Sequence, residues 1–524
     1  MFEWVRKLFG EKKGGRETDT GVKASEHTET RVSEPVETTN LERVETGEPK
    51  RTKATYPESA KTEEGKPSPA PAPRPKRDFH LGLDWGTSTT KLVLRDYSQG
   101  DQGLAYVLCF DGAEGGYRYP SAVAVRDGRI HLGPNADRKG GGLYSLKALA
   151  IGGQVGALVP GSTNLSYEDL ATLYLAHVLN RAWSQTAALA DRVGAEPRLG
   201  VTLGVPTDVS WSRFAQAGTY LRMVRTAYQL GVRESLDPQG FSEAEGLSAV
   251  EGARTRVTQS ADFDTWLRPE LAAATLWGFR SPAIEPGLYS CVDVGAWTAN
   301  TSFFRIRHEV VDGDYQEKGG LGFFGGACRP PAMNDLCSLL ASKAGVAPET
   351  LRGSENDAVE RFGRGVAEPV LARIFETWRL GFHNSYGHEA RQEAWRHLRV
   401  LPIGGGSKVD AVRQLLTRFP LPGWDPPRLE PDLGCPRDLF NLPRPRQANR
   451  EAFSGDSAFL LVAYGLSVRY GDFPPMRLAD EIQPLPSIGQ EHQRKDQAPR
   501  AGMCQQCGER RPMLGDTVCR DCGG

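Results

Sequence analysis

The pattern of apolar and polar positions divides the chain into a long patterned body and two polar segments. Residues 11–78 are rich in Glu, Thr, Lys, Pro and Ser and contain almost no aliphatic residues. Such a segment buries too little apolar area to offset its ordering entropy, so it is predicted to be a disordered linker. Over residues 79–473, strand-like apolar runs alternate with helical segments, which predicts an α/β body. Residues 474–502 are polar again and are interpreted as a second linker.

The first ten residues differ from the linker behind them. On a helix, the apolar side chains of Met1–Phe9 fall within one arc, and the first sixteen positions hold five basic residues against two acidic ones. This pattern predicts a short basic amphipathic segment that contacts a membrane surface or a partner protein. A frayed terminus with chance patterning is the alternative, because nine residues form a weak helix alone.

Composition narrows the class of protein. The 524 residues carry a formal net charge of -1, which argues against a dedicated polyanion-binding protein. A membrane-spanning helix needs about 18 or more consecutive apolar residues, and the sequence contains no such run. Five of the nine cysteines are scattered, as expected for small buried side chains in a reducing compartment. We therefore expect a cytoplasmic protein, with attachment to the membrane surface as the alternative.

An approximate internal repeat is the most informative feature of the body. Phe79–Leu94 and Tyr289–Phe304 each consist of an apolar strand ending in Asp-x-Gly, a short polar turn with Thr, and a second apolar strand. Glycine in such a turn lets backbone N–H groups approach phosphate oxygens closely. Hydroxyl groups in the turn add donors, and a carboxylate at the strand end can hold the waters of Mg²⁺. The residues in question are Asp84, Gly86, Thr87 and Ser88 in the first copy, and Asp293, Gly295 and Thr298 in the second.

Two such loops that face each other would hold a triphosphate from both sides. Either loop alone is also typical of an ordinary β-turn, so the pair carries the interpretation. A third element, Val400–Leu416, runs from an apolar strand through a glycine-rich turn into an amphipathic helix. Gly405, Gly406 and Ser407 would let a flat base lie against the backbone, and the stem of Lys408 would cover its other face.

In this order, the motifs resemble those of the actin-like ATPase superfamily, and within it the nucleotide-binding domain of the seventy-kilodalton heat-shock chaperones. The two repeat copies look like the two phosphate motifs, and Pro402–Leu416 looks like the adenosine motif. The other stretches that carry the resemblance are Arg118–Asp137, Ser145–Gly152, Val201–Asp208, Pro269–Gly278 and Asp456–Val468.

The resemblance implies two similar lobes of ribonuclease-H type, with ATP or ADP and Mg²⁺ in the cleft between them. Asp84 and Asp293 would hold Mg²⁺ and its waters, together with Asn300, and these three are the catalytic candidates. Phosphate contacts would come from Gly86, Thr87, Ser88, Gly295 and Thr298. The adenosine would lie against Gly405, Gly406, Ser407 and Lys408.

The chain departs from the chaperone pattern at both ends of the expected γ-phosphate site. The chaperones have a lysine after the Gly-x-x-Ala of the early region, whereas Asp137 stands here. Its carboxylate would oppose the triphosphate charge unless it turns away and Arg138 or Lys139 takes the place of the lysine. Asn300 stands in place of a second aspartate, and an amide accepts no proton. We therefore expect slow or absent hydrolysis. Too few residues follow the body to build a peptide-binding domain, so we expect no clamping of unfolded clients.

The C-terminus carries four clustered cysteines in residues 503–524. Cys504, Cys507, Cys519 and Cys522 form two C-x₂-C-G knuckles, which is typical of a structural zinc ribbon with tetrahedral thiolate ligands. A redox dithiol is the alternative. Charges around the knuckles nearly balance, so a protein partner is a better expectation than nucleic acid.

The leading functional hypothesis is a chaperone-like nucleotide switch that acts through a protein partner. A small-molecule kinase of the sugar-kinase type is the second hypothesis, because Asp84–Lys91 also fits that branch of the superfamily. A nucleotide-dependent filament-forming protein at the membrane is the third, favoured by the amphipathic head.

Overall fold

The computed structural model describes the body and short pieces of the C-terminus. The described residues are 73–477 without 101, 112, 114–115, 138–141, 145, 152–155, 160–161, 207–216, 261–262, 312–313, 331, 352–353, 387–391, 418–426, 431–432, 442–456 and 474–475, together with 501–503, 510–514 and 518–519. Apart from Pro73 they all belong to one compact unit, Arg74–Gly524. The predicted amphipathic segment Met1–Gly10 and almost all of the predicted linker 11–78 lie outside them.

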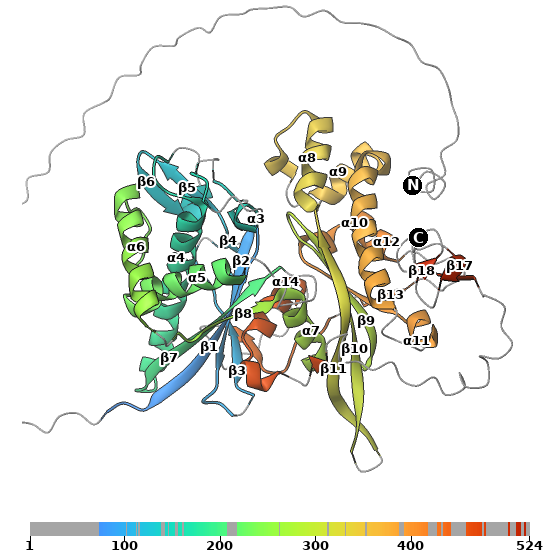
Figure 1. Ribbon diagram of the computed structural model, residues 1–524, viewed down its shortest axis with the longest axis horizontal. Coiled ribbons are helices and arrows are strands. Elements are labelled where there is room, and N and C mark those ends of the chain that lie inside the picture. Colours follow the sequence, from blue (N-terminus) through green and yellow to red (C-terminus); the bar gives the residue numbers. More distant parts are fainter. Residues whose placement is uncertain are drawn as a thin grey trace, which may run out of the picture. The chain divides into compact units, whose positions relative to one another are not determined.

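The described part of the chain is a mixed α/β structure with two large sheets (Figure 1). The first sheet has the strand order β14-β3-β2-β1-β7-β8, and β4 pairs with β2 beside this path. Its strands are β1 Lys76–Trp85, β2 Thr89–Asp96, β3 Leu104–Val107, β4 Tyr119–Pro120, β7 Glu196–Val205, β8 Thr265–Pro269 and β14 Leu439–Asn441.

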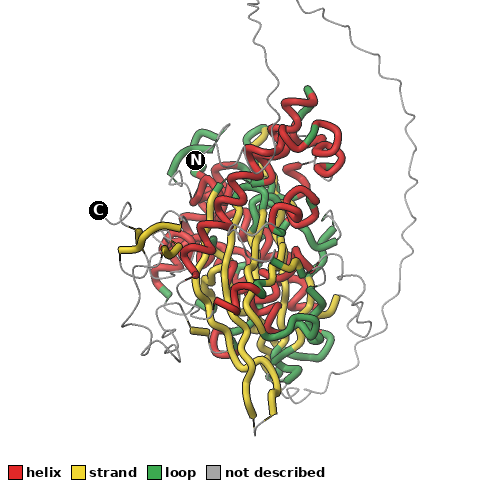
Figure 2. The backbone as a smooth tube through the Cα atoms, turned by 90° about the vertical axis from the view of Figure 1, so that its right-hand side faces the viewer, coloured by secondary structure: helices red, strands yellow, loops and turns green. Residues whose placement is uncertain are grey.

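The second sheet has the order β13-β12-β9-β10-β11-β15. Its strands are β9 Gly287–Val294, β10 Ala299–Val311, β11 Asp314–Arg329, β12 Arg399–Ile403, β13 Arg428–Leu429 and β15 Met476–Arg477. The long hairpin of β10 and β11 extends past the neighbouring strands in both views (Figures 1 and 2).

The two sheets repeat one topology. In the first, β1 is antiparallel to β2 and parallel to β7, while β2 is antiparallel to β3 and β7 is parallel to β8. In the second, β9, β10, β11, β12 and β13 take the same places with the same directions. The edge strands correspond as well, because β14 is parallel to β3 and β15 is parallel to β11. The duplication that the sequence repeat indicated for two hairpins therefore extends to six strands of each sheet.

Helices cover the sheets and connect their strands. The longer ones are α4 Tyr167–Asp191, α5 Ala217–Tyr228, α6 Glu243–Gln259, α7 Glu270–Arg280, α8 Met333–Ala344, α9 Glu355–Phe362, α10 Arg364–Tyr386, α12 Asp410–Leu416 and α14 Ser457–Leu466. Short ones are α2 Pro134–Asp137, α3 Leu146–Ile151, α11 Gln392–Arg396 and the single turn η4 Gly405–Lys408. Smaller sheets pair β5 Val123–Arg126 with β6 Arg129–Leu132, and β16 Ala501–Met503 with β17 Arg510–Leu514 and β18 Val518–Cys519.

Helices α7 and α14 pack against each other and against both large sheets. Helix α14 contacts β1, β2, β7 and β12, and α7 contacts β7 to β11. Their shared core includes Trp277, Tyr289, Phe304 and Tyr464, all fully buried. Separate apolar cores lie under α4, α5 and α6 on the first sheet and under α8, α10 and α12 on the second. The α7–α14 pair thus joins the two halves of the body.

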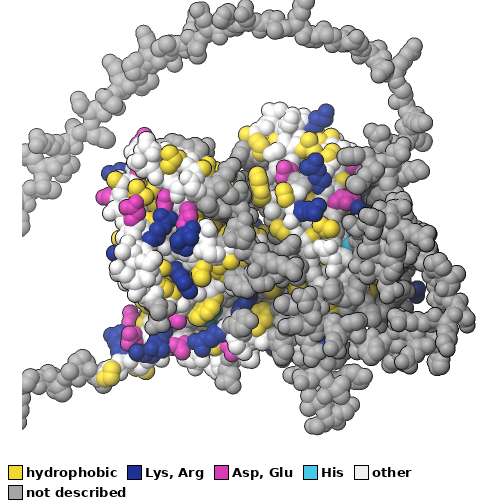
Figure 3. All heavy atoms as spheres, in the orientation of Figure 1, with side chains coloured by type: hydrophobic (Ala, Val, Ile, Leu, Met, Phe, Trp, Pro, Cys, Tyr) yellow, Lys and Arg dark blue, Asp and Glu magenta, His cyan; other side chains and the backbone are white. Residues whose placement is uncertain are grey.

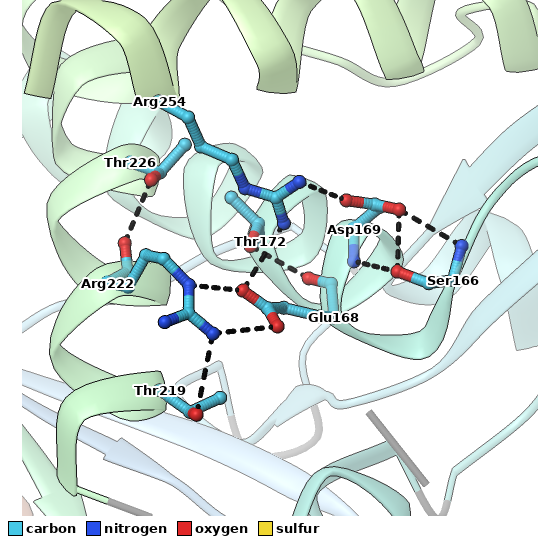
Figure 4. Close-up of polar contacts among 8 residues, drawn as sticks. All are labelled: Ser166, Glu168, Asp169, Thr172, Thr219, Arg222, Thr226 and Arg254. Carbon is cyan, nitrogen blue, oxygen red and sulfur yellow. Dashed lines mark hydrogen bonds and ion pairs between the residues drawn. The ribbon is translucent and has the colours of Figure 1, made fainter. Parts of the chain in front are cut away.

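Charged side chains fix how the helices of the first half meet (Figure 4). Ser166 caps α4 in a capping box with Asp169, which satisfies free N–H groups of the first turn. Arg222 of α5 lies 2.8 Å from the Glu168 carboxylate, and Arg254 of α6 lies 2.8 Å from that of Asp169. The start of α4 is therefore tied to both neighbouring helices.

The body begins earlier and ends later than the sequence boundaries 79 and 473. Strand β1 starts at Lys76, because Lys76–Asp78 pair with Glu196–Arg198 through backbone groups that need no apolar side chains. At the other end, Met476 of β15 pairs with Leu321 of β11. A few residues of each predicted linker, 11–78 and 474–502, therefore belong to β-strands.

Two surface properties follow from the described residues. No helix among them combines the length and the apolar character needed to cross a membrane. On the face shown in Figure 3, Lys and Arg side chains alternate with Asp and Glu. The described part of that face therefore carries charges of both signs.

Candidate functional site

The first hairpin, β1–β2, places a carboxylate and an amine side by side. Asp84 pairs with Lys91 across the two strands, and Lys91 Nζ lies 2.8 Å from Asp84 Oδ2. Both side chains are largely buried. A Cβ at Gly86 would lie 2.5 Å from the Thr89 carbonyl oxygen, so the turn accepts only glycine at this point. Thr87 and Ser88 complete the turn and are half-buried.

The second hairpin, β9–β10, repeats this register with different chemistry. Asp293 pairs with Asn300, which stands where Lys91 stands in the first hairpin. The Asn300 side chain hydrogen-bonds Asp293, and its buried Oδ1 has no hydrogen-bond partner among the described residues. The Gly295 N–H donates to the Thr298 carbonyl oxygen at 3.0 Å and closes the turn.

Helix α8 holds the tip of the second hairpin. The Met333 N–H donates to the Gly295 carbonyl at 3.1 Å, and the Asn334 N–H donates to the Ala296 carbonyl at 2.7 Å. These are N–H groups of the first helical turn, which need acceptors from outside the helix. Trp297, which follows Ala296 in the turn, is 41% exposed. The turn is thus anchored by its backbone while its largest side chain faces solvent.

A third carboxylate, Glu270, opens helix α7 and lies among these groups. Lys147 of α3 forms an ion pair with it, and both side chains are less than a tenth exposed. Pro269 ends β8 and precedes Glu270, and proline fixes the backbone at the point where the strand becomes a helix. The ion pair therefore connects α3 to the start of the helix that joins the two halves.

The electrostatics show that the two hairpins meet. The pKa of Asp293 is raised to about 6, chiefly by burial and also by the charges of Glu270 and Asp84, while Lys91 opposes the shift. Burial would lower the pKa of Lys91, but Asp84, Asp293 and Glu270 together raise it above its ordinary value. Because a Coulomb interaction weakens with distance, these mutual effects indicate that charged residues of both hairpins and of α7 lie near one another, and we call them one cluster.

The glycine-rich turn lies against the same cluster. Ile403 at the end of β12 pairs with Asp293, and a Cβ at Gly404 would lie 2.1 Å from Asp293 Oδ1. Ser407 is buried and donates to the Gly404 carbonyl at 2.7 Å. Gly405 is exposed, whereas Gly406 packs on Val294.

Lys408 points to a different neighbour. Its Nζ lies 5.6 Å from the centre of the Phe459 ring of α14, and the Arg118 guanidinium lies 4.6 Å from the same ring. Cations over an aromatic face attract the ring's negative π density. The turn therefore reaches Asp293 through Gly404 and a cation–aromatic group through Lys408.

The structure brings together the three catalytic candidates singled out in the sequence, and adds three residues. Asp84, Asp293 and Asn300 belong to the cluster, and Gly86 and Gly404 leave room for the Lys91 and Asp293 side chains. Sequence reasoning missed Lys91, Lys147 and Glu270. Each lies inside a stretch that was singled out, Asp84–Lys91, Ser145–Gly152 and Pro269–Gly278 respectively, so a signal was present.

Two expectations fall outside the described residues. Arg138 and Lys139, the expected substitutes for a missing lysine, are not described, and neither is the side chain of Asp137. Cys504, Cys507 and Cys522 are also outside, and Cys519 is described only as the last residue of β18. Within the described ranges, no group of three or more His, Cys, Asp or Glu residues could hold a metal ion.

No protein-family model matches the sequence, and no curated protein matches it.

Proposed function

We propose that this chain binds an adenine nucleotide with Mg²⁺ where the two hairpins meet, and acts as a chaperone-like nucleotide switch with slow or absent hydrolysis. The observation that carries the proposal is the convergence of two Asp-x-Gly hairpins with the same register on one charged cluster. Backbone N–H groups of both turns and the ammonium group of Lys91 are the donors that a polyphosphate needs.

The fold supports the same proposal. The sequence resemblance led us to expect a two-lobed actin-like ATPase with duplicated lobes, and two sheets of identical topology flank α7 and α14. In such a molecule the nucleotide lies where corresponding strand ends of the two halves face each other. Asp84 and Asp293 end corresponding strands, β1 and β9.

The donor set fits Mg²⁺. This ion prefers carboxylate oxygens and waters, usually with one or two protein carboxylates and phosphate oxygens. Asp84 and Asp293 supply carboxylates, and the unpaired Oδ1 of Asn300 is a buried acceptor for a metal-bound water. When bound, Mg²⁺ would neutralise phosphate charge. Lys408, with Gly405, Gly406 and Ser407, would hold the nucleoside near Phe459.

Slow turnover follows from the groups that surround the phosphates. Asn300 accepts no proton, and Glu270 is held in an ion pair by Lys147. A carboxylate engaged by an ammonium is a weaker general base than a free one. Asp293 is the remaining carboxylate of the second hairpin, and it would be occupied by the metal.

The coupling to a partner would run through α7 and α14. These helices contact both sheets. A nucleotide that draws the two hairpins together must therefore also change the angle at which α7 and α14 cross. The partner would be a protein in the cytoplasm, contacted through the C-terminal cysteine segment with Zn²⁺ bound or through the head at a membrane surface.

Calorimetric titration of the full chain with ADP and ATP in the presence of Mg²⁺ tests the proposal. We expect saturable binding of both nucleotides, and loss of binding in Asp293→Ala. Asp357→Ala on α9, which lies outside the cluster, is the matched control. Phosphate release should be slow or absent. Failure of either nucleotide to bind at saturating concentration overturns the proposal, and rapid Mg²⁺-dependent turnover overturns its slow-hydrolysis part.

A further inference from the structure

The pair Asp84–Lys91 is the feature of the cluster that a nucleotide site alone does not explain. The two residues face each other in the β1–β2 register, and the side chains are 8% and 13% exposed respectively. At 2.8 Å, the ammonium is in direct contact with the carboxylate that the proposed function assigns to the metal. A protein cation thus stands where a metal cation or its water would be expected.

The charges of the cluster show what this ammonium does. Asp84, Glu270 and Asp293 supply three carboxylates, and Lys91 and Lys147 supply two ammonium groups. With Lys91 present, the charges of the cluster nearly cancel. An incoming divalent cation is then repelled by the ammonium group that lies beside its ligand, Asp84. Without Lys91, the same cation would meet two uncompensated carboxylates. Asn300, at the equivalent place in the second hairpin, leaves Asp293 without such a counterion.

Lys91 is also placed to contact an anion in the first turn. Its Nζ lies 3.3 Å from the point that a Cβ at Gly86 would occupy. The ammonium therefore lies beside the backbone of the turn that would receive phosphate oxygens. A lysine has four rotatable side-chain bonds and a compact charge, so a short movement would exchange a carboxylate partner for a phosphate partner.

We propose that Lys91 is a built-in counterion that keeps divalent cations from Asp84 until a nucleotide arrives, so that metal and nucleotide bind as a pair. The polyphosphate draws the ammonium toward itself, frees the Asp84 carboxylate and supplies the remaining oxygen ligands. The inference rests on the proposed function and adds an order of events to it. By linkage, metal and nucleotide each raise the affinity for the other, by about 5- to 150-fold in typical coupled sites.

Titration of the full chain with Mn²⁺ alone, and again with ADP saturating, tests the inference. We expect negligible metal uptake without nucleotide and clear uptake with it. Lys91→Met should take up Mn²⁺ without nucleotide, and Lys91→Arg, which keeps the charge, should not. In the double variant Asp84→Asn/Lys91→Met the nucleotide-independent uptake should disappear, which would assign it to Asp84.

The titration of the wild-type chain needs no variant, so it tests the inference even if Lys91→Met does not fold. Uptake of Mn²⁺ by the wild-type chain with equal affinity in the presence and absence of ADP overturns the inference and leaves nucleotide binding intact. Absence of uptake in a folded Lys91→Met chain also overturns it. Failure of ADP to bind under any condition is a different result, because it overturns the proposed function itself. Circular dichroism of each variant establishes that it is folded.

Discussion

Gly404 stands directly against the carboxylate of Asp293. A Cβ at position 404 would lie 2.1 Å from Asp293 Oδ1, and the backbone φ of 73° is one that side chains other than glycine disfavour. The glycine-rich turn therefore serves the second hairpin by leaving room for its aspartate, besides any contact with a nucleoside.

We expect Gly404→Ala to weaken nucleotide binding and to lower stability. The methyl group must displace the Asp293 carboxylate or shift the turn, and overpacking of this kind costs about 1–3 kcal/mol. Gly365→Ala on α10 is the matched control, because that residue is exposed and nothing lies within 4 Å of a Cβ at its position. Calorimetry with ADP and urea unfolding of both variants measure the difference. Equal effects of the two substitutions would contradict the role assigned to Gly404.

Replacement of only one partner of the Lys147–Glu270 ion pair should lower the free energy of unfolding substantially. Lys147→Met would leave the Glu270 carboxylate buried without its counterion, which destabilises proteins by about 3–5 kcal/mol. We expect the double variant Lys147→Met/Glu270→Leu to recover part of this loss, since it buries no unpaired charge. Denaturant unfolding of the three proteins gives the coupling energy.

An exposed ion pair supplies the comparison for this experiment. Arg74 and Asp191 lie 2.8 Å apart, but their side chains are 63% and 64% exposed. Water screens such a pair, and exposed pairs contribute about 0–1 kcal/mol. Asp191→Asn should therefore leave the unfolding midpoint nearly unchanged. A loss as large as that of Lys147→Met would contradict the importance of burial.

Stability should fall in acid because of His80. This side chain is buried and its Nε2 lies 2.8 Å from Thr202 Oγ1. Burial, with the charges of Arg268, Arg469 and Arg95, lowers the pKa of His80 from 6.5 to about 3. Below about pH 6.5 the unfolded chain binds a proton that the folded chain does not, so stability falls by up to ~1.4 kcal/mol per pH unit until the folded pKa is reached.

We expect His80→Gln to flatten the pH profile of the unfolding free energy between about pH 6 and pH 4. Thr202→Val, which removes the hydrogen-bond partner and keeps the imidazole, should lower stability without removing the slope. Urea titrations at several pH values measure both. An unchanged slope in His80→Gln would show that other groups dominate this range.

The crossing of α7 and α14 should tolerate no side chain at Gly465. A Cβ there would lie 1.9 Å from the Ala273 carbonyl oxygen. We expect Gly465→Ala to separate the helices, to lower the melting temperature and to weaken nucleotide binding, because both sheets rest on this pair. Gly471→Ala is the control, since a Cβ at that residue meets nothing within 4 Å. Thermal unfolding with and without ADP distinguishes loss of stability from loss of binding.

The four C-terminal cysteines should bind one zinc ion per chain. We expect metal analysis to find it, and to find it lost in Cys519→Ser, because removal of one of four thiolates opens the tetrahedral site. Cys109→Ser, in the body, should keep the metal. Full zinc content in Cys519→Ser would refute the ribbon.

What the sequence predicted well are features that local pattern controls. Both Asp-x-Gly hairpins and the glycine-rich turn formed as expected, because strand alternation and glycine placement act over a few residues. The Lys147–Glu270 pair, in contrast, joins residues 123 positions apart. Neither segment alone contains information that predicts its partner, so local pattern could not reveal this pair.

Edge strands were missed for another physical reason. Strands β14 and β15 have three and two residues, too few to show any periodicity, and they pair through backbone groups. The polar start of β1, Lys76–Asp78, was assigned to the linker because its side chains resemble those of the linker. Backbone pairing does not depend on side-chain polarity, so pattern reasoning places such boundaries poorly.

The position of β14 bears on how the protein is made. This strand pairs with β3 at the edge of the first sheet, yet more than three hundred residues separate the two in the chain. While the ribosome is still synthesising the second half, the β3 edge offers unpaired N–H and C=O groups to any neighbouring nascent chain. Chains truncated before residue 439 should therefore aggregate during expression, even though they contain nearly the whole first sheet.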